Sequence, residues 1–123
     1  MTQEDKQLLL KDLCARLPYG VKIKLGDYDY QVCGYNSEKE MPVKIWYYYD
    51  SNLTLKSYID VYLTDYRPYL RPMSNIASLI SAKEWSSLGG IELIDFYNSN
   101  HIDYRGLIPK GLALEAPEEM YKL

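Results

Sequence analysis

Cysteine, histidine and phenylalanine are scarce in this chain of 123 residues, which has two, one and one of them respectively. Cys14 and Cys33 could form one disulfide at most, and we expect free, buried thiols in a reducing cytoplasm. A zinc site needs four ligands at characteristic spacings, and the chain has no C-x-x-C pair. We therefore expect neither a bound metal nor a cofactor.

Long apolar runs and clusters of basic residues are also missing. No run approaches the roughly 18 residues that cross a bilayer, and the polar, acidic start Thr2–Asp5 does not resemble a signal peptide. The formal net charge is −3, and neither half of the chain is basic. This balance disfavours non-specific nucleic-acid binding, which depends on neutralising phosphates, although a local basic patch stays open. We expect a cytoplasmic protein without a membrane partner.

Catalytic motifs are nearly absent. His101 stands close to Asp103 and Arg105 and could act as a general base, but no recognisable nucleophile motif accompanies it. Asp27-Tyr28-Asp29 is a weak metal-binding pattern that a solvated turn explains as well. The glycine pair Gly89-Gly90 fits neither a P-loop nor a dinucleotide-binding loop. The sequence therefore favours a protein that is not an enzyme.

Tyrosine, in contrast, occurs 14 times. A core built for packing alone more often uses phenylalanine, because a buried tyrosine hydroxyl needs a hydrogen-bond partner. The excess of tyrosine over phenylalanine indicates aromatic rings on partly solvated surfaces, such as sheet faces or contact patches.

Hydrophobic spacing predicts an N-terminal helix over residues 3–17, capped by Thr2 and stopped by Pro18-Tyr19-Gly20. The period then changes to two, which is typical of half-buried strands. Four strands joined by short turns predict an antiparallel meander; they cover residues 21–25, 28–35, 43–49 and 55–63.

The second half of the chain is less regular. Arg67-Pro68 and Arg71-Pro72 are expected to end the last strand, since proline donates no ladder hydrogen bond. Short helices are predicted from Ser81 and over 91–98, followed by an irregular tail that packs back on the domain. The prediction is one α+β domain, residues 1–123, with four or five antiparallel strands. Periodicity leaves open whether the sheet closes into a small SH3-like barrel.

Two stretches could form a contact surface. Trp46 and Tyr48 alternate along one strand and could pair with Tyr58 and Tyr62 on the next, as a platform for bases or apolar side chains. Ordinary cross-strand packing under a helix is the alternative. The stretch 66–72 combines tyrosines with arginine forks suited to phosphate, carboxylate or peptide recognition. The alternative there is an extended segment along a sheet edge with locally paired arginines. The candidate binding residues are Trp46, Tyr48, Tyr58, Arg67, Tyr69 and Arg71.

Three blocks of sequence carry a resemblance: residues 1–21, Pro68–Ser74 and Asp103–Pro117. In this order they resemble a family of small uncharacterised proteins carried by gut anaerobic bacteria and their prophages. The resemblance implies a bacterial cytoplasmic setting on a mobile element. It implies no activity and no catalytic residues.

The sequence thus predicts a non-enzymatic binding or accessory protein that contacts a protein partner through a Tyr- and Arg-rich surface. Binding of single-stranded nucleic acid on the aromatic sheet face is the alternative, which the acidic net charge disfavours.

Overall fold

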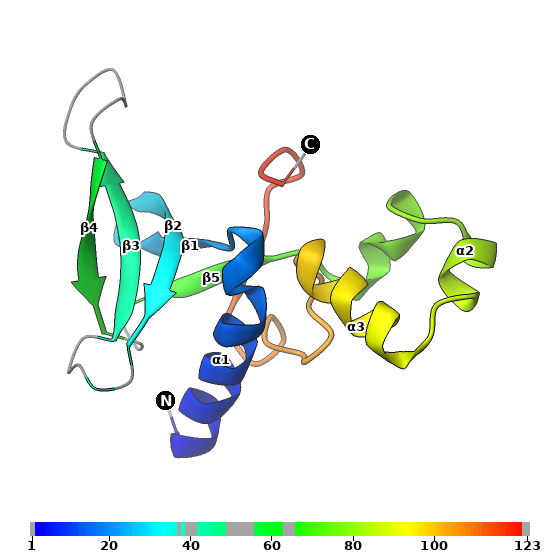
Figure 1. Cartoon of the computed structure of the whole chain (residues 1–123), viewed down its shortest axis with the longest axis horizontal. Coiled ribbons are helices and arrows are strands. Elements are labelled where there is room, and N and C mark those ends of the chain that lie inside the picture. The colour runs from blue at the N-terminus through cyan, green and yellow to red at the C-terminus, as the bar shows by residue number, and fades with distance from the viewer. Residues whose placement is uncertain (1, 37, 39–41, 49–55, 63–65, 122–123) are drawn as a thin grey trace. The chain divides into compact units, whose positions relative to one another are not determined.

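The computed structural model describes residues 2–36, 38, 42–48, 56–62 and 66–121. The chain forms two compact units, Met1–Pro68 and Tyr69–Leu123. The expectation of a single domain stays a prediction. A helix comes first along the chain, strands follow it in succession, and further helices come after them (Figure 1), so the α+β class is confirmed. Among the described residues, no helix has the length and apolar character needed to span a membrane.

The first unit begins with helix α1 (Gln3–Arg16), and its start is a complete capping box. The Thr2 hydroxyl accepts the Asp5 amide at 3.0 Å, and the Asp5 carboxylate accepts the Thr2 amide at 3.3 Å. A short 3₁₀ turn, η1 (Leu17–Tyr19), follows. It ends at Gly20, whose φ of 67° is a conformation that glycine adopts without a Cβ clash. The predicted helix and its stop are both confirmed.

Four antiparallel strands come next: β1 (Lys22–Leu25), β2 (Tyr28–Tyr35), β3 (Val43–Tyr48) and β4 (Lys56–Val61). Each pairs with its predecessor, so the predicted meander is confirmed. The register of β2 against β3 shifts between Val32 and Gly34, which is a β-bulge. The core of the unit combines side chains from α1 with those from one face of this sheet; its members are Leu9, Leu13, Val21, Ile23, Val32, Val43, Ile45, Val61 and Tyr66.

Strand β5 (Arg67–Leu70) departs from the sequence prediction, which ended the regular strand at Arg67-Pro68. Its first half, Arg67 and Pro68, pairs with β1, whereas its second half pairs in parallel with β6 (Leu114–Glu115). A proline is tolerated here because each half of the strand is paired on one side only. The strand order is β4-β3-β2-β1-β5-β6, so the sheet has six strands and is mixed, and its described strands form an open order.

The second unit contains η2 (Met73–Ser78), α2 (Ala82–Ser86) and α3 (Gly90–Ser99). Ser81 caps α2 by accepting the Glu84 amide at 3.2 Å, as its sequence predicts. The irregular segment after α3 packs into this unit, as expected. Its buried apolar side chains are Ile102, Leu107, Leu112 and Ala113.

Candidate binding site

Strand alternation divides the sheet of the first unit into a core face and a second face, which we call the outer face. Val43 and Ile45 are fully buried on β3, so Lys44 and Trp46 belong to the outer face. Residues directly opposite each other on paired strands share a face. The described members of the outer face follow from this register: Lys22, Lys24, Asp29, Gln31, Lys44, Trp46, Asp60 and Arg67.

The aromatic part of the outer face lies on β3 and β4. Trp46 is half-buried, and the register places Tyr58 directly opposite it on β4. Tyr62, just after β4, is 41% exposed. The side chains of Tyr48 and Tyr58 lie outside the described residues, so of these two candidates only the backbone positions are known. The predicted pairing of the Trp46 strand with the Tyr58 strand is confirmed.

Gly34 on β2 stands opposite Lys44 of β3. A Cβ atom at position 34 would lie 3.6 Å from Cδ and 3.8 Å from Cβ of Lys44. The aliphatic part of Lys44 therefore crosses close over the glycine backbone. Both distances are ordinary van der Waals contacts, so these contacts leave room for a Cβ atom at position 34.

The cationic part of the outer face lies around β1. Lys22 and Lys24 alternate with the buried Ile23, and Arg67 on β5 stands opposite Lys24. Lys24 also faces Asp29 across the β1–β2 ladder. With Lys44 and Asp60, the described outer face carries four cations and two carboxylates. The outer face is thus locally positive although the net charge of the chain is negative, so the net charge alone does not reveal this face.

Tyr69 and Arg71, the other two candidates, are placed differently from the expected exposed surface. Tyr69 is only 8% exposed, and its backbone carbonyl accepts the Tyr121 hydroxyl at 2.8 Å. Arg71 is half-buried and donates to the backbone oxygens of Tyr121 at 2.9 Å and of Asn100 at 3.5 Å. Both residues therefore make contacts within the second unit. Tyrosine and arginine are more often found at the surface, but here their contacts within the unit bury them fully or in part.

Around Arg71 the second unit forms an aromatic–cation cluster. The guanidinium carbon lies 5.9 Å from the centroid of the Tyr121 ring, and the His101 ring stacks on the same tyrosine at 3.9 Å. Backbone hydrogen bonds join Arg71 to His101 and Asp103, at 2.7 and 2.8 Å. His101 is buried with a positive φ of 56°, which is uncommon for a residue with a side chain. The tail of the chain is thereby tied to the start of the unit.

The residues that flank His101 have structural partners of their own. Both carboxylate oxygens of buried Asp103 accept backbone amides, from Leu107 at 2.8 Å and from Ile108 at 2.9 Å. The guanidinium of Arg105 lies 4.4 Å over the Tyr104 ring. These contacts hold Asp103 and Arg105 in the 103–108 loop.

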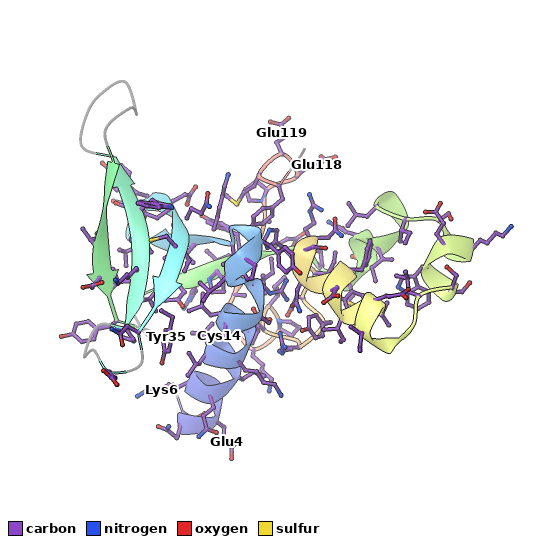
Figure 2. The ribbon with its side chains drawn as sticks, viewed as in Figure 1. Glu4, Lys6, Cys14, Tyr35, Glu118 and Glu119 are labelled. Carbon is purple, nitrogen blue, oxygen red and sulfur yellow. The ribbon has the colours of Figure 1, made fainter. Side chains whose placement is uncertain are left out.

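A buried polar cluster in the first unit escaped the sequence interpretation. Arg16 donates to the Asp12 carboxylate through Nε and Nη2, and both side chains are at most 1% exposed. Their i, i+4 spacing on a helix was the available signal. Burial, together with the nearby Asp12, Cys14 and Tyr35, raises the pKa of Tyr66 far above its ordinary value; Figure 2 labels Cys14 on α1 and Tyr35 on β2.

The cysteines are both free thiols. Cys14 is exposed and Cys33 half-buried, so the expectation of buried thiols does not hold for Cys14. Partial burial nevertheless raises the pKa of the Cys14 thiol.

Asp27 and Asp29 are both exposed at the β1–β2 turn. In the part of the chain that the structure describes, no three His, Cys, Asp or Glu side chains gather as metal ligands.

Comparisons with family models, with curated proteins and with solved structures found no match for this chain.

Proposed function

We propose that this protein is a non-enzymatic binding protein whose outer face contacts an acidic region of a protein partner. One observation carries the proposal: the strand register gathers Trp46 with Lys22, Lys24, Lys44 and Arg67 on a single face. Aromatic and arginine side chains are the groups most often found at the energetic centre of protein interfaces.

The charge pattern favours a protein partner over a bare polyanion. Asp29 and Asp60 lie among the cations of the outer face, and this mixture suits a partner that carries both signs. The chain as a whole is acidic, so long-range steering would oppose a phosphate backbone. Arg67 remains the exposed arginine of the proposed surface, while Tyr69 and Arg71 are left out of it.

Charge reversal on the outer face tests the proposal. In nuclease-treated lysate of the source organism, the Lys24→Glu, Arg67→Glu variant should lose a stoichiometric protein partner that the unmodified chain captures. The matched control reverses two exposed lysines elsewhere, Lys11→Glu and Lys110→Glu, and changes the net charge equally. Capture that survives the outer-face reversal but not the control reversal would contradict the proposed surface.

Single-stranded nucleic acid is the second candidate ligand, because the outer face combines Trp46 with two more cations than carboxylates. Trp46 could stack a base, while Lys24 and Arg67 approach phosphates. Fluorescence anisotropy with a labelled oligothymidylate should then show binding that weakens steeply with salt. The Lys24→Glu, Arg67→Glu variant should flatten that salt dependence. The absence of any anisotropy change at low salt would end this candidate.

A further inference from the structure

Helix α3 in the second unit carries an apolar stripe that runs from the core into solvent. Ile91, Ile94 and Tyr97 follow one another at intervals of three and therefore lie along one side of the helix. Tyr97 is 7% exposed, Ile94 42% and Ile91 81%. Tyr97 stacks on Tyr104 at 5.1 Å, which anchors the buried end of the stripe. The first two turns of α3 thus present Ile91, which is largely exposed, and Ile94, which is partly exposed.

The surroundings of these isoleucines are acidic. Glu92 and Asp95 are exposed, and Asp95 lies one turn from Ile91 and adjacent to Ile94 in the helix. Between Lys83 and Arg105 the sequence has four carboxylates and no lysine or arginine.

The acidic side chains beside the stripe favour some binding partners over others. In a twofold pairing of two copies through the stripe, each Glu92 and Asp95 would meet the same carboxylates of the other copy, and like charges at an interface oppose association. A partner with apolar side chains flanked by lysine or arginine would instead cover the isoleucines and neutralise the carboxylates. Amphipathic helices commonly bind to apolar surfaces through anchors spaced three and four residues apart.

We propose that the stripe formed by Ile91 and Ile94, with Glu92 and Asp95 beside it, is a docking site for a basic amphipathic segment of a partner protein. This site goes beyond the proposed outer-face function. It lies in the other unit and prefers the opposite charge, so either site can fail without the other.

The test uses the full chain and a fluorescein-labelled synthetic helical peptide with leucines on one face and lysines on its flanks. Saturable binding should weaken about tenfold or more in Ile91→Ser, the loss expected for a residue near the centre of an interface. The matched control is Ile59→Ser, since Ile59 of the first unit is also an exposed isoleucine, at 39%. Binding that is absent, or equally weakened by both substitutions, would overturn the proposal.

The charge requirement is tested separately. Glu92→Gln with Asp95→Asn should weaken peptide binding and flatten its salt dependence, whereas Glu118→Gln with Glu119→Gln removes two exposed carboxylates of the same unit (Figure 2) and should leave both unchanged. Circular dichroism checks that each variant keeps its helix content. An equally tight complex with a peptide whose lysines are replaced by glutamate would contradict the proposal. So would a dimer in sedimentation velocity that Ile91→Ser dissociates, because a second copy would then occupy the stripe.

Discussion

Arg16 and Asp12 form a two-pronged ion pair inside the first unit, one helical turn apart. Nε of Arg16 lies 2.9 Å from Oδ2 of Asp12, and Nη2 lies 3.0 Å from Oδ1. Neither side chain has more than 1% of its surface exposed. The planar guanidinium matches the two carboxylate oxygens, and this geometry compensates in part for removing both charges from water.

Breaking this ion pair should be costly, because it strands one buried charge. We expect Asp12→Leu to lower the free energy of unfolding by about 3–5 kcal/mol, as is usual when one partner of a buried pair is removed. The double variant Asp12→Leu, Arg16→Met should be more stable than Asp12→Leu alone, since it leaves no unpaired charge. Urea unfolding of the four proteins of this double-mutant cycle measures the coupling. Additive effects would show that the pair contributes little.

Tyr66→Phe should make the protein less sensitive to alkali. Tyrosine in an unfolded chain ionises near pH 10, whereas burial raises the pKa of folded Tyr66 well above that. The contribution of the neutral Tyr66 side chain to the free energy of unfolding is therefore fully present below about pH 10. It is lost as the pH rises further, because only the unfolded chain ionises there. The variant should gain up to about 1.4 kcal/mol on the unmodified chain for each pH unit above 10. Urea unfolding between pH 8 and 11 checks this.

At neutral pH the same substitution should be neutral or stabilising. The Tyr66 hydroxyl is buried and accepts or donates no hydrogen bond among the described residues. Removing such a group removes an uncompensated desolvation cost. Tyr35→Phe is a useful control on the neighbouring, half-buried tyrosine of β2. A loss of more than about 1 kcal/mol in Tyr66→Phe at pH 7 would show that the hydroxyl is bonded.

Asp103→Ala should destabilise the second unit strongly. The substitution leaves the amides of Leu107 and Ile108 without their acceptor, and each unsatisfied buried group costs about 1–3 kcal/mol. Asp103→Asn keeps one acceptor oxygen and should cost less. Amide hydrogen exchange is the suitable measurement, because it reports positions 107 and 108 separately. Similar exchange in both variants would contradict the proposed role of the carboxylate.

Local patterns predicted the elements that depend on neighbours in sequence. Helix α1 follows from its apolar spacing and from the Thr2–Asp5 capping box, and the alternation in β2 gives its bounds as Tyr28–Tyr35. Strand β5 was missed because its pairing partners, β1 and β6, are distant in sequence and compensate for Pro68. The two-residue strand β6 is too short to produce a periodic signal of its own.

The candidate site residues likewise divide into those that local patterns predict and those that depend on long-range pairing. Alternation put Trp46 and Tyr48 on the same face of β3 but left open which face of the strand is buried, and the buried Val43 and Ile45 place Trp46 on the other face. No local pattern could show that β1 and β5 bring Lys24 and Arg67 to that same face, since this depends on strand register. The stretch 66–72 also indicated Tyr69 and Arg71 as contact residues, whereas long-range contacts with Tyr121 accompany the burial of Tyr69 and the partial burial of Arg71.

The stacking of His101 on Tyr121 gives the second unit a spectroscopic probe of its own. His101 is the sole histidine of the sequence, so its imidazole carbon-bound protons should give proton NMR lines that need no assignment experiment. A tyrosine ring stacked at 3.9 Å shifts such lines by its ring current. The integrity of this unit could therefore be followed from two resonances, during denaturation or ligand titration, without labelling the protein.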